Sequence, residues 1–261
     1  MPDTADTKSR PSAAKRQPAV KPVDAAGLVL IRQGRNGPPE VLLGRRHMRS
    51  GFLPDIYVVP GGRVDGEDNL PSGFPEAPHP AVAAMLDSGG CKRPVAAFLR
   101  AALRETHEET GLLVGRDAAI AAAHQRIADL PIWQAYAAAD LVPDLGSLDF
   151  LLRAITPVTS PRRYNTRFFL ADGEQAAGTL TGNGELEDLG WRRQSDLADL
   201  NIVDVTHAVL AESFRRWENR IAIGITRPKL LNYKNNIMTL RRHRDRGDRI
   251  STARPGLTSG G

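Results

Sequence analysis

The hydrophobic pattern is most regular between residues 94 and 112, where it predicts a helix. Small, apolar and β-branched residues recur there at helical spacing, at Val95, Leu99, Ala102, Leu103 and Thr106. Pro94 suits the first helical turn, and Gly111 suits the left-handed position just past a helix end. This is the best-specified helix in the sequence.

Other stretches predict strands and further helices. A small and β-branched run at 25–31 and a second apolar run at 40–43 flank a Gly-Arg-Asn-Gly turn, so we expect a hairpin. Further strands are expected at 148–155, 167–171 and 185–191, and helices at 116–128, 131–141, from Ser195, and at 204–219. Because strands and helices alternate irregularly, the pattern favours an α/β fold, an α/β/α sandwich around a mixed sheet.

Both ends of the chain lack such periodicity. Residues 1–22 mix Pro, Ser, Ala, Asp and Lys, and residues 241–261 are rich in Arg and Gly, which predicts disordered tails around one domain at 23–240. A chain of 261 residues that is 41% hydrophobic can bury one substantial core, and neither composition nor repeats require a second domain.

The basic charge lies in the tails. Of the total +5, the two tails carry +7, which leaves −2 for the domain. A groove that follows a phosphate backbone is therefore not indicated, and we do not expect nucleic acid as the partner of the domain. Contact of the Arg-rich tail with RNA or anionic lipid is the alternative to a solvated tail.

The chain has the composition expected of a soluble cytoplasmic protein. Its single cysteine, Cys91, excludes an internal disulfide and fits a reducing compartment. No run of about 18 apolar residues is present, and the N-terminal stretch lacks the apolar core of a secretory signal, so no membrane is expected as a partner. A homodimer is compatible with these features, and the sequence does not decide the oligomeric state.

Three acids on the predicted helix are the first candidates for chemistry. Glu105, Glu108 and Glu109 stand at i, i+3 and i+4, so their carboxylates project from one face, beside the apolar stripe. Like charges at this spacing repel by about 0.2–0.5 kcal/mol per pair, and the C-terminal end of a helix disfavours anions. A hard divalent cation such as Mg²⁺ would turn this repulsion into a binding site. A solvated acidic face, with Arg104 paired to Glu108, explains these residues equally well.

An upstream stretch favours the metal site. Residues 52–68 contain a short apolar strand, a Pro-Gly-Gly turn and then three acids, Asp65, Glu67 and Asp68. Together with Arg104-Glu105-Thr106-His107-Glu108-Glu109-Thr110-Gly111-Leu112, this resembles the two halves of the Nudix box, so the chain resembles a Nudix hydrolase. It departs from the pattern in three ways, since Asp68 replaces a glutamate, Thr106 replaces an aliphatic residue, and 35 residues separate Asp68 from Arg104 where seven are usual.

The long separation points to one subgroup. An interrupted box resembles the coenzyme A and acyl-CoA diphosphatases, as do the Gly51-Phe52-x-Pro54 run and the stretch from Ile155 to Phe169. The insert, about residues 69–93, is rich in Pro, Gly and Ala, and we expect it to form a loop on the surface.

The resemblance implies a Nudix-type fold and a site dependent on Mg²⁺ or Mn²⁺. It implies Glu105, Glu108 and Glu109 as metal ligands, with the Gly61 carbonyl, Asp68 and a downstream Glu187 or Glu185 as further candidates. Glu105 is the candidate for orienting or deprotonating the water, and Arg104 for orienting a carboxylate. Guanidinium groups suit phosphate oxygens, and the candidate substrate-binding arginines are Arg45, Arg46, Arg49, Arg162 and Arg163.

Three functions remain open from the sequence. The first is hydrolysis of coenzyme A or acyl-CoA across its diphosphate, to 3′,5′-ADP and 4′-phosphopantetheine or its acyl derivative. The second is the same chemistry on another nucleoside diphosphate derivative, such as ADP-ribose or a dinucleotide. The third is a Nudix scaffold that binds a nucleotide or a protein without turnover, which the intact Arg-Glu-x-x-Glu-Glu set argues against.

Overall fold

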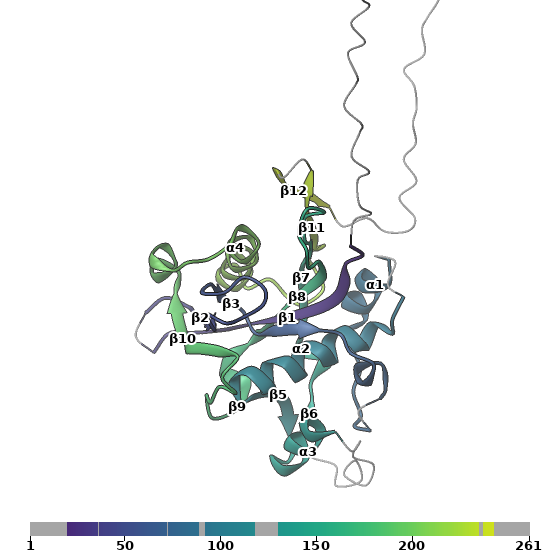
Figure 1. Ribbon diagram of the computed structural model, residues 1–261. Coiled ribbons are helices and arrows are strands. Elements are labelled where there is room, and N and C mark those ends of the chain that lie inside the picture. Colours follow the sequence, from purple (N-terminus) through teal and green to yellow (C-terminus); the bar gives the residue numbers. More distant parts are fainter. Residues whose placement is uncertain are drawn as a thin grey trace, which may run out of the picture.

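A mixed β-sheet with helices on both faces forms the centre of the molecule (Figure 1). The computed structural model describes residues 20–242, except 36, 72, 89–91, 118–129 and 235–236. In this part of the chain the main path of the sheet runs β10-β2-β1-β8-β7-β11-β12, with β3 paired to β2 and β4 paired to β1. The bounds of these strands are β1 Val23–Arg32, β2 Glu40–Arg46, β3 Tyr57–Val58, β4 Gly61–Arg63, β7 Asp149–Ile155, β8 Tyr164–Asp172, β10 Leu186–Arg193, β11 Lys229–Lys234 and β12 Ile237–Arg242.

The central strand β1 shows why the fold has three layers. Its side chains alternate between two hydrophobic clusters, with Leu28 and Leu30 on one face and Val29 and Ile31 on the other. A strand buried on both faces reads as a continuous apolar run, which is how this stretch appears in the sequence. The predicted hairpin with β2 is confirmed by the antiparallel pairs Ile31 with Val41 and Arg32 with Glu40.

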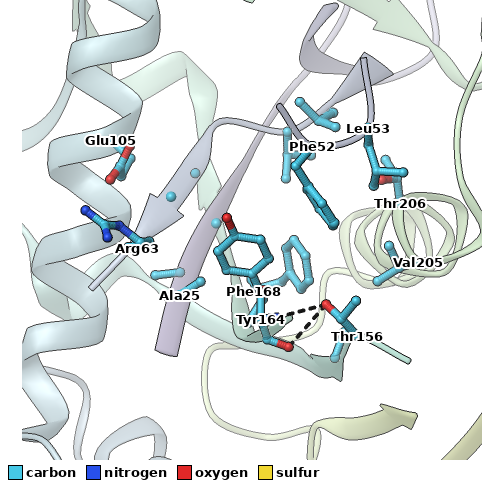
Figure 2. Close-up of a pocket in the computed structure, with 18 of the residues that line it drawn as sticks. Ala25, Phe52, Leu53, Arg63, Glu105, Thr156, Tyr164, Phe168, Val205 and Thr206 are labelled. Atoms are coloured by element: carbon cyan, nitrogen blue, oxygen red, sulfur yellow. Dashed lines mark hydrogen bonds between the residues drawn. The ribbon is translucent and has the colours of Figure 1, made fainter. Parts of the chain in front are cut away.

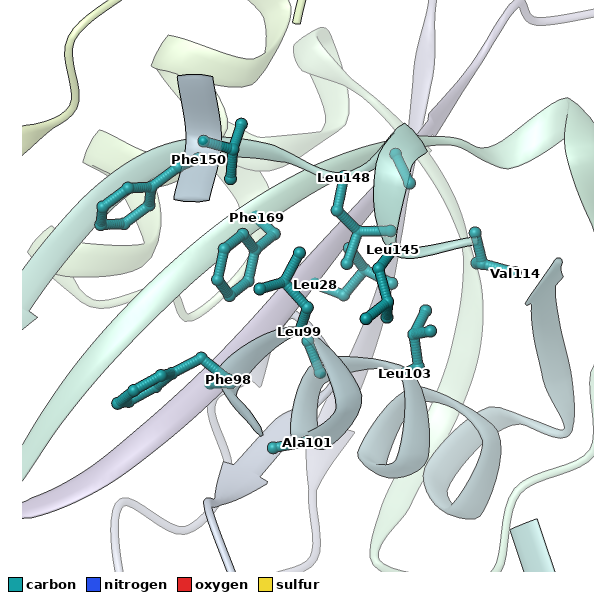
Figure 3. Packing of buried hydrophobic residues seen from close by; sticks show 14 of the residues in the cluster. Leu28, Phe98, Leu99, Ala101, Leu103, Val114, Leu145, Leu148, Phe150 and Phe169 are labelled. Atoms are coloured by element: carbon teal, nitrogen blue, oxygen red, sulfur yellow. The ribbon is translucent and has the colours of Figure 1, made fainter. Parts of the chain in front are cut away.

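Helices α1 (Pro80–Ser88) and α2 (Val95–Thr110) cover one face, and α4 (Asp204–Glu218) covers the other (Figure 1). On the α2 side, Phe98, Leu99 and Leu103 pack with Leu28 and Phe169 (Figure 3). On the opposite side, the cluster includes the α4 residues Val209, Leu210 and Phe214. The predicted α/β/α sandwich is confirmed.

The boundaries of α2 follow its sequence closely. Pro94 lies at the N-cap, one residue before the helix, and not in the first turn as predicted. Gly111 has φ 75°, in the left-handed region, and its N–H donates to the His107 carbonyl. Glycine at this position ends the helix without the steric cost of a Cβ.

The insert differs from the predicted surface loop. It contains α1, whose Val82 and Leu86 are fully buried against α2, and also the buried Phe74. Glu76 accepts a hydrogen bond of 2.5 Å from Arg100 Nε, with both side chains nearly inaccessible. The insert buries a few irregularly spaced apolar residues because α2 provides an apolar surface for them to pack on. The composition of the insert does not reveal that surface.

A small second sheet packs beyond α2. It has the order β6-β5-β9, with β5 at Leu112–Asp117, β6 at Leu141–Pro143 and β9 at Ala176–Gly178. The helix predicted at 131–141 is confirmed as α3 (Pro131–Ala138). The helix predicted at 116–128 is wrong at residues 116 and 117, which belong to β5, and its residues 118–128 lie outside the described residues.

The remaining predicted elements match with small shifts. Strands β7, β8 and β10 and helix α4 lie where the pattern placed them, and the helix expected from Ser195 is a short 3₁₀ turn at Gln194–Asp199. Strand β12 extends to Arg242, so the domain runs two residues beyond the predicted boundary at 240. Residues 1–19 and 243–261 of the predicted tails lie outside the described part of the chain. Among the described helices, none has the length and apolarity needed to cross a membrane.

Candidate active site

A cleft of about 670 Å³ brings the acidic helix together with segments from the whole domain. Its lining comes from the C-terminal half of α2, from β4, from the ends of β7 and β8, from the loop before β3 and from the first turn of α4. In Figure 2, Arg63 and Glu105 lie at one side of this cleft, and Phe52, Leu53, Val205 and Thr206 at the other.

Arg104 ties the turn after β4 to α2. Its Nε and Nη2 each donate to one oxygen of Asp68, both at 3.0 Å, and Nη2 also donates to the Arg63 carbonyl at 3.0 Å. Its Nη1 donates to Glu105 at 2.9 Å and to Glu108 at 3.1 Å. A buried guanidinium with planar donors holds several acceptors in fixed positions, so Arg104 fixes the directions of the carboxylates that it binds.

Asp68 is enclosed by donors. It is 2% exposed, and besides Arg104 it accepts a hydrogen bond from the Asp65 N–H at 2.8 Å. It does not line the cleft, whereas Asp65 does. These contacts are those of a residue that braces the turn, and they leave Asp68 poorly placed for the metal-ligand role that the resemblance suggested.

The Gly-Gly turn lies directly against the acids. The Gly61 N–H donates to Glu109 Oε2 at 2.8 Å. A Cβ at Gly62 would lie 2.4 Å from the carboxyl carbon of Glu105, closer than atoms can approach. Glycine is therefore required at position 62 so that β4 and the carboxylate of Glu105 can sit side by side.

The three glutamates of α2 have different environments. Burial raises the pKa of Glu105 to about 7, although the neighbouring Arg104 opposes the shift. Burial also raises the pKa of Glu109 to about 8, with repulsion from Glu105 and Glu185 adding to the shift and the Gly61 N–H opposing it. The Glu108 side chain is 47% exposed. The three acids that the sequence places on one helix face therefore differ. Glu108 is exposed, whereas Glu105 and Glu109 are largely buried and repel each other.

The donor set fits a hard divalent cation. Within the described residues, no three or more His, Cys, Asp or Glu side chains already form a metal-binding group. The carboxylates are held instead by Arg104 and by the Gly61 N–H. Oxygen donors of this kind are the ligands that Mg²⁺ prefers, and a cation would stabilise the ionised forms of buried acids whose pKa values are raised.

Of the two downstream glutamates, Glu185 lies at the cleft. It lines the cleft together with Glu109. Glu187 instead lies 3.2 Å from Arg45 Nη2 and 3.5 Å from His47 Nε2, and it is not among the cleft residues.

The candidate arginines fall into two groups. Arg46 lines the cleft, donates to Ser50 Oγ at 2.9 and 3.2 Å, and is close enough to Glu109 to lower the pKa of that acid. Arg49 is exposed and, with Arg46, lines a second cavity of about 290 Å³. These two arginines are brought together near the acids.

The other three arginines line neither cavity. Arg45 binds Asp55 and Glu187. Arg163 donates to two backbone carbonyls, of Thr156 at 3.1 Å and of Val20 at 2.7 Å. Arg162 lies against Gly51, where a Cβ would come within 2.7 Å of its Nη1.

Sequence reasoning missed the apolar part of the cleft. It is lined by residues from distant segments, namely Phe52, Leu53, Ile155, Tyr164, Phe168, Val205 and Tyr233. Phe52 and Tyr164 contact edge to face, with ring centroids 5.2 Å apart. Phe52 had a signal in the sequence, as part of the Gly51-Phe52-x-Pro54 run, and Ile155, Tyr164 and Phe168 lie in the second stretch that carries the resemblance. Val205 and Tyr233 had no such signal.

Comparison with solved structures gives the class. A Nudix hydrolase from Alicyclobacillus acidocaldarius matches with a TM-score of 0.57 and 28% identity, over 78% of this chain and 98% of that one. A MutT Nudix hydrolase from Burkholderia pseudomallei matches with a TM-score of 0.43 and 17% identity, over 74% and 98%. The Nudix domain of Shewanella oneidensis NrtR, in complex with ADP-ribose, matches with a TM-score of 0.41 and 12% identity, over 80% and 94%. No family model and no curated protein matches the chain.

The fold, the Gly-Gly turn against an acidic helix and the likeness to the Alicyclobacillus enzyme define a pyrophosphohydrolase of the Nudix type. This likeness supports the Nudix superfamily that was inferred from the residues. Enzymes of this fold act on diphosphate linkages in nucleoside diphosphate derivatives.

Proposed function

We propose that this protein hydrolyses coenzyme A or its acyl thioesters across the diphosphate, with Mg²⁺ or Mn²⁺, to 3′,5′-ADP and 4′-phosphopantetheine or its acyl derivative. The observation that carries the proposal is the juxtaposition of Glu105, Glu109 and Glu185 with Arg46 in one cleft. Such a cleft offers oxygen ligands for a cation and a guanidinium for a phosphate oxygen. A cytoplasmic location and a homodimer belong to the same proposal and rest on the sequence alone.

We propose separate roles for the acidic residues in binding the cation and in bracing the turn. Glu105, Glu108 and Glu109 would hold the cation, which when bound neutralises diphosphate charge and lowers the pKa of water. Glu185 is better placed than Glu187 for any further carboxylate role, because it lines the cleft. The contacts of Asp68 with Arg104 support a bracing role for that acid. The Gly61 carbonyl remains a candidate ligand.

Glu105 is the proposed group for orienting or deprotonating the water. Burial raises its pKa to about 7 in the metal-free protein, and a bound cation would favour the ionised form that a base requires. Arg104 donates to Glu105 at 2.9 Å and so fixes the direction of its carboxylate.

Two features support a coenzyme A derivative over ADP-ribose. The insert between the halves of the box, about 69–93, is the feature by which the chain resembles the coenzyme A diphosphatases. The cleft also has an apolar part, lined by Phe52, Tyr164 and Val205 among others. ADP-ribose ends in a polar sugar, whereas an acyl-pantetheine arm presents apolar surface that such a lining could cover.

Product analysis tests the proposal. Coenzyme A, acetyl-CoA, ADP-ribose and a dinucleotide would each be incubated with the enzyme and Mg²⁺ or Mn²⁺, and the products separated by chromatography. We expect 3′,5′-ADP from the coenzyme A substrates. Efficient cleavage of ADP-ribose with coenzyme A and its thioesters untouched would show that the substrate is wrong although the Nudix chemistry stands.

A further inference from the structure

Two cavities of opposite character meet at the carboxylates. The cleft of about 670 Å³ and the cavity of about 290 Å³ share Arg46, Glu109 and Glu185 in their linings. A substrate cleaved near Glu109 therefore has two directions in which its two ends can extend. The chemistry of the two linings indicates which end of the substrate each cavity would bind.

In the smaller cavity the shared Arg46 is opposed by Glu109 and Glu185, whereas the rest of its described lining carries Arg49 and His47 and no acid. Besides the shared residues the cavity is lined by His47, Arg49, Ser50, Gly184 and Leu186. His47 Nδ1 accepts a hydrogen bond of 2.9 Å from the Arg49 N–H, which fixes the backbone that carries the Arg49 side chain. Arg49 is exposed, while Arg46 is partly buried and close enough to Glu109 to lower the pKa of that acid.

The far part of the larger cleft is uncharged and mostly apolar, with a few hydroxyl groups such as those of Thr156 and Thr206. Among the described residues that line the cleft, every charged one belongs to the end formed by α2, by β4 with the turn that follows it, and by Arg46 and Glu185. The opposite side is built from Leu53 and Phe52 above, Tyr164 and Phe168 between, and Val205 at the start of α4 (Figure 2). Leu53 is held there in the left-handed region, with φ 49°, and is 39% exposed.

We propose that the substrate lies across Glu109 with its phosphate-bearing nucleotide end in the smaller cavity of Arg46, His47 and Arg49 and its apolar arm in the part of the cleft lined by Phe52, Leu53 and Val205. This orientation rests on the proposed function. It assigns recognition of an additional phosphate on the nucleotide to Arg49, and selection for an apolar arm to Leu53 and Val205.

The reverse orientation is disfavoured by charge. A phosphate placed among Phe52, Tyr164 and Val205 would lose its hydration without gaining a cationic partner. An apolar chain placed beside Arg46 and Arg49 would bury little apolar surface and would desolvate two guanidinium groups. Ligand sites commonly combine an apolar lining with a few placed polar groups, which is the division seen across these two cavities.

The test compares ratios of kcat/KM in the full-length enzyme with Mg²⁺. The first ratio is coenzyme A over dephospho-coenzyme A, measured for the wild type, Arg49→Ala and the matched control Arg35→Ala. Arg35 is an exposed arginine in the turn between β1 and β2 and lines neither cavity. We expect the wild-type preference to fall roughly 10-fold in Arg49→Ala, as for loss of a partly exposed charge-assisted contact, and to persist in the control.

The second ratio is a medium-chain acyl-CoA over acetyl-CoA, measured for Leu53→Asn with Val205→Asp as a second variant. Asn tolerates the left-handed backbone at position 53, and Asp is favourable in the first turn of a helix, so both variants should fold. We expect the wild type to prefer the longer chain by roughly 10-fold, consistent with burial of a few methylene groups, and the preference to be lost in both variants. Ile225→Asp, at a 72% exposed position, is the control.

Several results would overturn the orientation while leaving the hydrolysis in place. These are equal effects of Arg49→Ala on coenzyme A and dephospho-coenzyme A, a chain preference unaffected by both apolar-site variants, or loss of the phosphate preference only in Arg162→Ala/Arg163→Ala. If the wild type cleaves none of these substrates, the proposed function fails, and calorimetry with 3′,5′-ADP and 5′-AMP still tests the smaller cavity. There, equal affinity for both nucleotides in the wild type would refute the role of Arg49.

Discussion

Two buried arginines in this molecule each bind several carboxylates, and their surroundings differ. Arg216 on α4 is 1% exposed and binds Asp149 and Glu212, which are themselves 4% and 6% exposed. It also donates to the carbonyls of Phe150 and Leu151 at 3.2 and 3.3 Å. Arg104 on α2 is 8% exposed and binds Asp68, Glu105 and Glu108.

The two networks differ in whether arginines compensate the charge of the buried carboxylates. Burial alone would raise the pKa of Glu212, but hydrogen bonds from Arg215 and Arg216 bring it below its ordinary value. Around Arg104, burial raises the pKa of Glu105 to about 7 and that of Glu109 to about 8. The α4 network is a satisfied structural bridge, whereas the α2 network has surplus acid facing a cleft. Unmatched charge beside a cavity, and not burial of charge as such, marks the functional site.

Removing the centre of the structural network should have the largest effect. Arg216→Met would leave Asp149 and Glu212 as buried charges, and we expect a loss of about 3–5 kcal/mol in the free energy of unfolding, measured with urea. Arg215→Met is the matched control, because the Arg215 side chain is 45% exposed and its pair with Glu212 should contribute less than about 1 kcal/mol. Equal losses in the two variants would remove the distinction between the buried and exposed arginines.

Removing a carboxylate of α2 should lower turnover without unfolding the protein. We expect Glu109→Gln and Glu108→Gln each to lower kcat by at least about 100-fold, or about 2.7 kcal/mol in transition-state free energy, with the melting temperature kept. The exposed Glu218 of α4 supplies the control, Glu218→Gln, with wild-type turnover. Near-wild-type activity in both α2 variants would refute the metal-site assignment.

The pH dependence of stability should also separate the networks. Glu105 and Glu109 have folded-state pKa values raised above the ordinary value of 4.5, so their protonated forms are favoured by folding. The metal-free protein should therefore lose stability as the pH rises from about 4.5 through about 8. Differential scanning calorimetry should show a fall of several degrees over this window.

Added Mg²⁺ should offset this loss most at the alkaline end, because it favours the ionised carboxylates. Glu109→Gln should flatten the profile of the metal-free protein. A profile that rises with pH in the wild type, or is unchanged in the variant, would contradict the assignment of surplus acid to this site.

The smallest effect is expected from deletion of the tails. Deleting residues 1–20 and 245–261 should leave turnover on small substrates within about twofold and the melting temperature unchanged, because these segments lack the apolar surface to join a core. The deletion removes the Val20 carbonyl, which accepts a hydrogen bond from Arg163. This hydrogen bond is exposed to solvent, so its loss should cost little stability. A melting temperature lowered by several degrees would show that a tail packs on the domain.

Local pattern predicted most of the fold. Helix α2 was expected at 94–112 and lies at Val95–Thr110, since its apolar spacing and the glycine at its end are local signals. The insert was mispredicted as a surface loop, because burial of Val82, Leu86 and Phe74 depends on a surface contributed by α2 and by α3 with β5. The strands β11 and β12 were both missed, since their sequence lies next to the basic tail and their pairing with each other and with β7 is a tertiary feature.

Within the site, the sequence by itself determined the acid spacing on α2, the Gly-Gly turn and the arginine at position 104, because each lies in a short contiguous motif. Only the tertiary structure decided that Glu109 is buried and Glu108 exposed, and that Asp68 serves Arg104. The tertiary structure also decided that Glu185 lines the cleft and that Arg163 donates to backbone carbonyls. The apolar lining of the cleft comes from segments up to 181 positions apart, from Phe52 to Tyr233. Burial, and with it pKa and charge pairing, depends on which distant segments pack together, and no local spacing encodes that.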